Sequence, residues 1–452
     1  MPATATRDVR REEHGSTVRA AIVLALLTLV LQAVSATWVV HSFESPNGTT
    51  LLARTWLRRG EYGLFSWQRL VGWSHVASRV EPLRMFHLPG AAVYQLAVFE
   101  TLPEPFHRYQ QLPITLLFVL AVFRVATLAG GTRAGAAAGF LAACYPFMVV
   151  HGPVWDDAML GAALEWAALA MIVSAIMERS ESRPWWRAAT LALLCGYAAL
   201  VRAESQVTMA ATAVTLILAK RVRLRREGMA MLLGVAIAVF AWGERNRSLT
   251  GSFFTGTSHD GITLYESNYD HAMEALLTRG QVEVLNETYM QAEFTHAATL
   301  GNELEMDRYF RQLGVEQIRS HPVRTLRWGV VKLAVTLTGV GPQFSLVSLK
   351  NLVALGSSLA LYALAMAGYF GMRRGPAWRE ALMPGLFLAV ALPTVVGALI
   401  GPAGFRYQMP LLGMWFVMGG AGLWQMTSLR DRDRLRRHRP VEREQARAKQ
   451  VS

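Results

Sequence analysis

The hydrophobic residues of this 452-residue chain fall into long blocks that are separated by short polar connections. A helix that crosses a membrane needs about 20 largely apolar residues, and most of the blocks approach or reach that length. Arginines, or glycine and proline, close the blocks, as expected at the ends of membrane helices. The pattern therefore predicts transmembrane helices over 18–40, 112–130, 134–150, 156–177, 187–201, 204–219, 228–243, 349–370, 381–400 and 408–428.

The longer stretches between these blocks predict further helices outside the bilayer core. Residues 90–101 are apolar, but twelve residues of helix rise only about 18 Å, so we expect this helix to lie at the membrane interface. Residues 302–320 place their apolar side chains on one stripe, which predicts an amphipathic helix. The block 325–341 either crosses the membrane or lies at its surface, and the charge pattern favours the surface.

Positive charge follows the same division. The chain carries a formal net charge of +13, and the charge gathers in the short connections and the C-terminal tail. This bias places both termini in the cytoplasm. It predicts a cytoplasmic N-terminus (1–17), a transmembrane core (18–243) with a first outer loop (41–111), an extracytoplasmic segment (244–324), C-terminal transmembrane helices (325–428) and a basic cytoplasmic tail (429–452).

Several function classes are disfavoured. The basic residues form no patch on a folded face, so the charge does not indicate nucleic-acid binding. Cys144 and Cys195 both lie inside apolar blocks and offer neither a disulfide framework nor metal-ligand spacing. The first apolar block is too long for a cleavable signal peptide. We therefore expect a multi-pass protein of the plasma or inner membrane.

Short motifs occur in order along the outer ends of the predicted helices. They resemble those of the GT-C superfamily of membrane glycosyltransferases, in particular the branch of protein mannosyltransferases and aminoarabinose transferases that use a polyprenyl-phosphate sugar. The motifs are the first-loop segment 43–62 with His87-Leu88-Pro89-Gly90, the helix start Trp155-Asp156-Asp157, the helix end Leu200-Val201-Arg202, the run Trp242, Arg245, Asn246, Gly251, Phe253, Gly261, Leu264, Tyr265 and Asn268, and Arg406-Tyr407 with Pro410.

The resemblance implies an all-α integral membrane fold, a GT-C-like bundle of about ten transmembrane helices (nine to twelve), with interfacial helices in the first outer loop. It also implies a reaction. A sugar would pass from a polyprenyl phosphate in the membrane lipid to a hydroxyl of a protein, lipid or glycan acceptor, with inversion, on the extracytoplasmic face. No cofactor is required for this chemistry, and a divalent metal is allowed but optional.

Such a transfer needs a carboxylate that takes the acceptor proton. Glu44 is the first candidate. In the family this acid is usually Asp, eight residues before a helix alanine, and here that position is Ser45. Asp156 and Asp157 would orient the acceptor, act as an alternative base or hold a metal; otherwise they cap a helix.

The leaving phosphate needs cations. Arginine is planar, permanently charged and able to bind an oxyanion through two N–H groups. Each candidate also has a structural alternative: a salt bridge in a turn, the start of a loop, or a side chain that reaches from the bilayer to water. The motifs of the resemblance place the candidate substrate contacts at His87, Arg202, Glu204, Arg245, Asn246, Arg406 and Tyr407. Lys332, in the ambiguous block 325–341, is a further candidate because its ammonium would reach a lipid head group.

Two other functions fit the same sequence. A flippase or transporter of lipid-linked glycans would also be polytopic, but it would place charges near the bilayer midplane and often show internal repeats. We find no repeat, and the charges cluster at helix ends. A catalytically degenerate relative that serves as a partner subunit is the third alternative, because of the Glu44/Ser45 departure.

Overall fold

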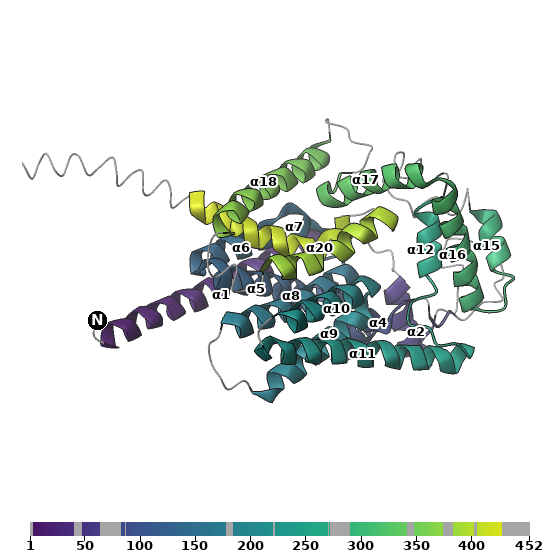
Figure 1. Cartoon of the computed structure of the whole chain (residues 1–452), viewed down its shortest axis with the longest axis horizontal. Coiled ribbons are helices and arrows are strands. Elements are labelled where there is room, and N and C mark those ends of the chain that lie inside the picture. The colour runs from purple at the N-terminus through teal and green to yellow at the C-terminus, as the bar shows by residue number, and fades with distance from the viewer. Residues whose placement is uncertain are drawn as a thin grey trace, which may run out of the picture.

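The computed structural model describes residues 3–39, 48–63, 83–85, 87–177, 184–219, 222–269, 271, 290–340, 348–373, 383–401 and 405–426. Within these ranges the chain is almost entirely helical and contains no β-strand, which confirms the all-α prediction. The helices form a bundle whose axes run in broadly the same direction (Figure 1).

A helix occupies each of the ten predicted spans. They are α1 (Ala3–Val39), α5 (Leu112–Gly130), α6 (Thr132–Cys144) with α7 (Pro146–His151), α8 (Asp157–Met177), α9 (Trp185–Val201), α10 (Ala203–Leu218), α11 (Val222–Thr250), α18 (Leu349–Met372), α20 (Met383–Ile400), and a helix over 409–426 that follows η4 (Phe405–Gln408).

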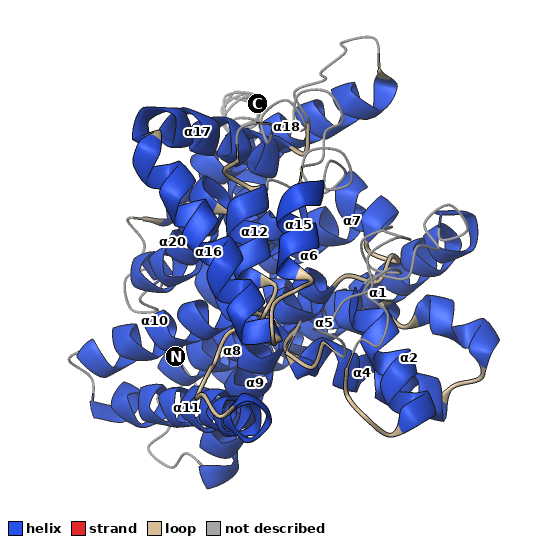
Figure 2. Cartoon of the chain, turned by 90° about the vertical axis from the view of Figure 1, so that its right-hand side faces the viewer, coloured by secondary structure: helices blue, strands red, loops and turns tan. Residues whose placement is uncertain are grey.

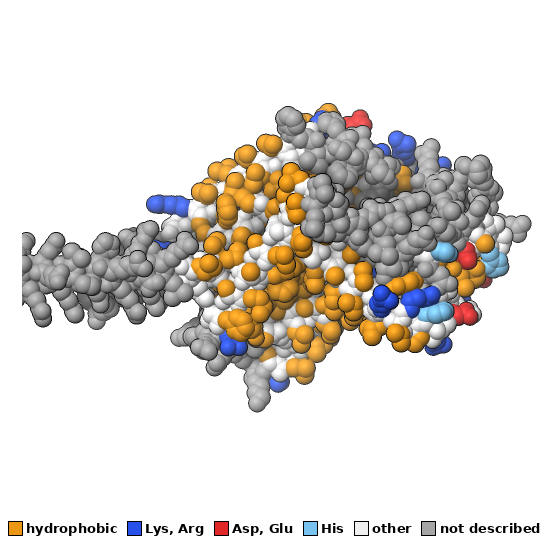
Figure 3. All heavy atoms as spheres, turned by 90° about the horizontal axis from the view of Figure 1, so that it is seen from above, with side chains coloured by type: hydrophobic (Ala, Val, Ile, Leu, Met, Phe, Trp, Pro, Cys, Tyr) orange, Lys and Arg blue, Asp and Glu red, His pale blue; other side chains and the backbone are white. Residues whose placement is uncertain are grey.

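Within the described ranges, six helical segments are long and apolar enough to cross a membrane, and α9 and α10 are shorter apolar helices. The six are Gly15–Thr37, Glu104–Gly130, Asp157–Met177, Leu224–Thr250, Asn351–Met372 and Met383–Ile400. Seen from above, hydrophobic side chains cover much of the visible middle of the molecule, whereas charged and histidine side chains lie mainly toward its ends (Figure 3). These features are those of a multi-pass membrane protein.

Small residues let the helices of the bundle approach closely. Gly196 of α9 faces Gly234 of α11, and a side chain at Gly234 would collide with the backbone of Ala192. Without a hydrophobic drive between helices in lipid, such close backbone contact is what holds membrane helices together. The core is completed by Trp166 of α8, which is fully buried and donates its indole N–H to the Pro410 carbonyl at 2.8 Å.

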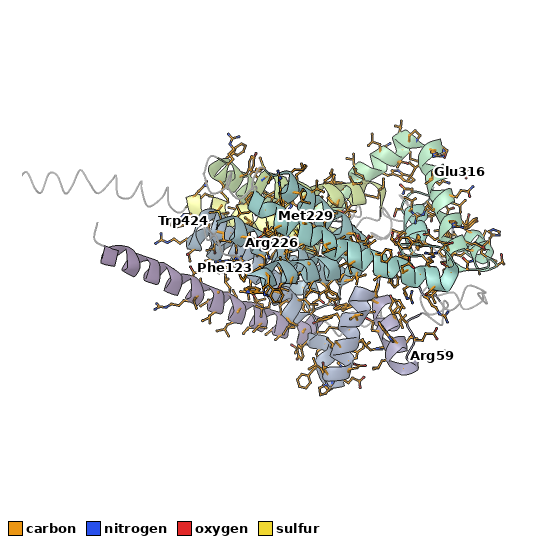
Figure 4. All side chains as sticks on the ribbon, turned by 60° about the horizontal axis from the view of Figure 1, so that its bottom comes forward. Arg59, Phe123, Arg226, Met229, Glu316 and Trp424 are labelled. Carbon is orange, nitrogen blue, oxygen red and sulfur yellow. The ribbon has the colours of Figure 1, made fainter. Side chains whose placement is uncertain are left out.

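The remaining helices gather at one end of the bundle, opposite the N-terminus (Figures 1 and 2). In a view with side chains, Arg59 and Glu316 lie at this end, and Trp424 lies at the other (Figure 4). We call this layer the cap. It consists of α2 (Gly48–Arg59), α4 (Pro89–Thr101), η2 (Glu104–Tyr109), α12 (Asp260–Glu266), α15 (Gln291–Ala297) and α16 (Glu303–Ser320).

Two segments far apart in sequence share one hydrophobic core in the cap. Leu52 and Ala92, from 41–111, pack in the same cluster as Phe294 and Phe310, from 244–324. The helices predicted at 90–101 and 302–320 are confirmed as α4 and α16. The Asn302 side chain caps α16 by accepting hydrogen bonds from the next N–H groups, and the helix stops before Pro322.

The ambiguous block forms α17 (Pro322–Thr338), which packs against α20. It exposes an apolar stripe that includes Val323, Leu326 and Val330. It is not among the six long apolar segments, and its position at the membrane surface stays a prediction, as do the domain boundaries. The tail 429–452 lies outside the described residues.

Candidate active site

Four of the predicted site residues meet at the cap end of the bundle. The Arg202 guanidinium donates to Asp157 Oδ1 and to Glu204 Oε1, both at 3.1 Å. The same guanidinium lies over the Tyr407 ring, 5.4 Å from its centroid. The Arg202 side chain is only 14% exposed, whereas Asp157 and Glu204 are 24% and 44% exposed. The guanidinium of the cluster is therefore largely buried, whereas its two carboxylates are more exposed to solvent.

The backbone explains how these side chains meet. Arg202 is an extended residue between the last residue of α9 and the first of α10, and Asp157 begins α8. Gly161, one turn along α8, leaves room for the stem of Arg202, because a Cβ there would lie 3.3 Å from Arg202 Cδ. Three helix ends thus converge on one guanidinium.

The two carboxylates of this cluster outnumber its one guanidinium, so the cluster is formally negative. Burial alone would lower the pKa of the Arg202 guanidinium, but the carboxylates of Glu204 and Asp157 raise that pKa above the usual arginine value. Two carboxylates share one cation, so the cluster carries no excess positive charge. This arrangement suits a held carboxylate better than a free phosphate clamp.

The adjacent aspartates have different surroundings. Asp156 Oδ1 accepts a hydrogen bond from the Ala158 N–H at 2.8 Å, as a helix cap does. Asp157 faces Arg202 instead. Just before them, the Trp155 indole donates to Thr49 Oγ1 at 2.9 Å and stacks on Tyr94. The aspartate pair is therefore fastened to the first outer loop.

Arg245 makes contacts within the cap. Its Nη1 donates to the Arg84 carbonyl at 2.8 Å, and its guanidinium lies over the rings of Tyr62 and Trp242. Its neighbour Asn246 is fully buried and donates to the Phe254 carbonyl at 2.7 Å. In the structure both residues hold loops together, and their contact with a substrate stays a prediction.

His87 has a partner that the sequence did not indicate. Its ring lies 5.5 Å from that of His259, centroid to centroid. His259 Nδ1 is 3.0 Å from the Thr263 hydroxyl, and the His87 carbonyl accepts a hydrogen bond from the Tyr62 hydroxyl at 2.8 Å. A single histidine in a run such as Ser258-His259-Asp260 gives little signal on its own.

The histidine pair and the Arg202 cluster are on adjoining pieces of backbone. Gly90, three residues after His87, packs on the end of α9, where a Cβ would lie 2.7 Å from the Leu200 carbonyl carbon. The Tyr197 hydroxyl donates to the Gly90 carbonyl at 2.9 Å. The first outer loop is thereby seated two residues from Arg202.

Lys332 is buried and makes two contacts to backbone. Its ammonium donates to the carbonyls of Gly401, at 3.0 Å, and Ser267, at 3.3 Å. These carbonyls follow the ends of α20 and α12, where helix dipoles favour a cation. Contact between Lys332 and a lipid head group stays a prediction.

Two predicted residues lie wholly or partly outside the described part of the chain. Glu44 lies outside the described residues, five positions before Thr49. Arg406 belongs to η4, next to Tyr407, but its side chain is outside what the structure describes. Their roles as base and phosphate contact stay predictions.

Sequence reasoning missed the buried acids of the described residues, of which Glu303 and Glu165 bear on the site. Glu303 accepts hydrogen bonds from the backbone N–H groups of Arg84 and Met85 and from the Ser258 hydroxyl. Its signal was an acid on the apolar stripe of an amphipathic helix. Glu165 of α8 is 1% exposed. Its signal was a lone ionisable residue within an apolar span.

The described residues do not form a metal site. No three His, Cys, Asp or Glu side chains among them are arranged to hold an ion, and Arg202 occupies an oxygen of Asp157. A metal at Asp156 and Asp157 stays a prediction.

Comparison with known proteins gives a likeness of fold. No protein-family model matches the chain, and no curated protein matches it in sequence. The oligosaccharyltransferase AglB from Archaeoglobus fulgidus, in complex with an inhibitory peptide and a dolichol-phosphate, superposes with a TM-score of 0.53 at 15% identity, over 94% of this chain and 51% of AglB. The same protein with Zn and sulfate gives 0.52 at 13% identity, over 93% and 50%.

ArnT from Cupriavidus metallidurans in the apo state is less similar. It superposes with a TM-score of 0.37 at 14% identity, over 89% of this chain and 76% of ArnT. The chain spans about half the length of the AglB structures. The chain accordingly shares an all-helical membrane fold with the AglB structures, and the resemblance that its motifs indicated is confirmed at the level of the fold.

Proposed function

We propose that this chain is an inverting glycosyltransferase that moves a sugar from a polyprenyl phosphate to an acceptor hydroxyl on the extracytoplasmic face of the membrane. The observation that carries the proposal is the Asp157–Arg202–Glu204 cluster at the cap end of an apolar bundle. Arg202 is charged but only 14% exposed, and a buried charge held on a membrane bundle is a candidate functional site. The fold it shares with AglB, which binds a dolichol-phosphate, supports a lipid-linked donor.

The proposed reaction is a single displacement. The acceptor oxygen forms a bond to the anomeric carbon of the sugar, and the bond between that carbon and the phosphate oxygen breaks. The polyprenyl phosphate leaves with the electron pair, and the acceptor proton passes to a carboxylate. Attack from the face opposite the phosphate inverts the configuration.

The residues take different roles in this scheme. Glu44 is the first candidate for the base, with Asp157 as the alternative that Arg202 aligns. Arg406 and His87 meet the phosphate, with Tyr407 and Glu204 beside them. Arg245, Asn246 and Lys332 act on the donor chiefly by holding the cap in place, because their described contacts are to protein carbonyls.

The orientation of the bundle in the membrane follows from its charge, and we infer that the cap lies on the extracytoplasmic side. The basic connections and tail are placed inside by their charge, and the cap lies at the opposite end of the bundle from the N-terminus (Figure 1). The protein, lipid or glycan acceptor would then approach from outside, while the donor enters from the membrane between helices.

The test is transfer in proteoliposomes supplied with a panel of polyprenyl-phosphate sugars. Glu44→Gln, Asp156→Asn and Asp157→Asn are assayed separately beside the unaltered protein. Loss of transfer in at least one of the Glu44 and Asp157 variants is expected. Unaltered rates in all three variants would remove the mechanism.

One observation keeps the flippase alternative in view, namely the buried Glu165 within the α8 span. A flippase would move a fluorescent polyprenyl-phosphate glycan across the same proteoliposome membrane without transferring its sugar. A degenerate subunit would bind the donor and do neither.

A further inference from the structure

A short segment of the first outer loop, 84–90, has its backbone held by side chains from several distant elements. Among its described residues, bound backbone groups include the N–H of Arg84 and Met85 and the carbonyls of Arg84, His87 and Gly90. The partners are Glu303 for both N–H groups, Arg245 for the Arg84 carbonyl, Tyr62 for that of His87 and Tyr197 for that of Gly90. A backbone contact from the Ser258 N–H to the Met85 carbonyl adds to these.

Among the side chains that bind the backbone of this segment, Glu303 accepts two of its N–H groups and also binds the Ser258 hydroxyl. One oxygen accepts from the Arg84 N–H, and the other accepts from the Met85 N–H at 2.9 Å and from the Ser258 hydroxyl at 2.8 Å. Its residue is only 6% exposed. One carboxylate at the start of α16 therefore links the segment to the turn that carries His259.

A buried carboxylate is an energetically costly way to hold a loop in place. A buried carboxylate loses much of its hydration, and burial raises the pKa of Glu303 although its three hydrogen bonds oppose that shift. Apolar packing or a backbone ladder would secure a loop at lower cost. Hydrogen bonds that fix the backbone next to a site, as those of Glu303 do here, are typical of sites that must hold a functional side chain within about 0.5 Å of its working position.

The side chain that this arrangement presents is His87. It follows Met85 by two residues, its ring stands 5.5 Å from His259, and Gly90 seats the segment on α9 beside Arg202. We propose that Glu303 is a positioning residue of the active site, which fixes the backbone of 84–90 so that His87 meets the donor phosphate. The part that concerns the phosphate rests on the proposed function.

The positional part can be tested without a substrate. Spin labels are placed at His87→Cys and at Val207→Cys, an exposed position on α10, in a background with Cys144 and Cys195 replaced by alanine. A narrow distance distribution is expected, which Glu303→Gln broadens. Asp307→Asn is the matched control, because Asp307 is a buried carboxylate of the same helix that binds the Gly261 N–H and Arg311 instead. An equally narrow distribution in the Glu303→Gln protein would overturn the proposal.

The functional part is a double-mutant cycle on the affinity for undecaprenyl phosphate in nanodiscs. Glu303→Gln and His87→Ala are each expected to weaken binding by roughly fivefold or more, and the double variant to be no weaker than the worse single variant. Independent, multiplying losses would show that Glu303 does not act through His87 and would overturn the inference. Asp307→Asn is expected to bind like the unaltered protein.

The two proposals fail in different ways. If the unaltered protein binds no polyprenyl phosphate, the proposed function is lost, whereas the spin-label distances still decide whether Glu303 positions the segment. If Glu303→Gln does not fold, Ser258→Ala removes a single hydrogen bond to the same carboxylate. A smaller broadening of the same distribution is then expected, and an unchanged one counts against the proposal.

Discussion

Arg202 and Asp157 form an ion pair of 3.1 Å at the point where α8, α9 and α10 meet below the cap. The two adjacent aspartates therefore have different contacts. Asp157 pairs with Arg202, whereas Asp156 caps α8 by accepting a hydrogen bond from the Ala158 N–H. The ion pair also ties the alternative base to one of the arginines that the sequence named as a candidate phosphate contact. The cation is already shared between Asp157 and Glu204, so its first effect is to orient carboxylates.

Asp157→Asn is therefore expected to lower the rate of sugar transfer, because an amide pairs poorly with Arg202. The loss should reach about 100-fold or more where Asp157, rather than Glu44, is the base, because an amide cannot take a proton. Asp156→Asn is the control, since asparagine also caps helices well. Initial rates with a polyprenyl-phosphate sugar measure both variants. Equal losses in the two would show that the Arg202 pair does not distinguish them.

Gly90→Ala probes the seat of the first outer loop on α9. A Cβ at this position would lie 2.7 Å from backbone atoms of Leu200, which cannot give way as a flexible side chain can. We expect a loss of stability of about 1–3 kcal/mol together with slower transfer. Gly356→Ala, on α18, meets nothing within 4 Å and should unfold at the same temperature as the unaltered protein or slightly above it.

Lys332→Met tests whether this ammonium serves the fold or the donor. The substitution leaves the carbonyls of Gly401 and Ser267 without their buried donor, which should cost about 1–3 kcal/mol of stability. The affinity of the folded protein for undecaprenyl phosphate should change by less than about threefold. A large loss of affinity at unchanged melting temperature would instead make Lys332 a head-group contact.

The two buried acids of α16 predict a dependence of stability on pH. Burial raises the pKa of Glu303 above 4.5 and that of Asp307 above 3.8. A carboxyl group with a raised pKa in the folded state adds stability that is complete below its unfolded pKa and lost as the pH rises through the folded one. The melting temperature should therefore contain a component that falls from about pH 4 upward, and Glu303→Gln should flatten it. An identical pH profile in that variant would contradict the assignment.

The sequence predicted the helices well because long apolar blocks and their polar boundaries are local signals. A helix lies at each of the ten predicted spans, and α4 and α16 lie where short or amphipathic patterns placed them. Asp157, Arg202, Glu204 and Tyr407 were named from motifs and do come together.

Contacts across the cap were harder to foresee. The partner of His87 is 172 residues away in sequence, at His259, and no periodicity links them. Glu303 could have been noticed as an acid on an apolar stripe, but its targets are backbone N–H groups, which the sequence does not distinguish. Arg245 and Lys332 looked like free cations, whereas the structure binds both to carbonyls.

The central claim is that a lipid phosphate binds at the cap end of the bundle, beside the Arg202 cluster. An electron cryo-microscopy map of the protein in nanodiscs with undecaprenyl phosphate tests it most directly. The account predicts phosphate density between His87 and the Arg406–Tyr407 turn, beside the Arg202 cluster. Density at the cytoplasmic end, or in the cap but remote from these residues, would contradict it.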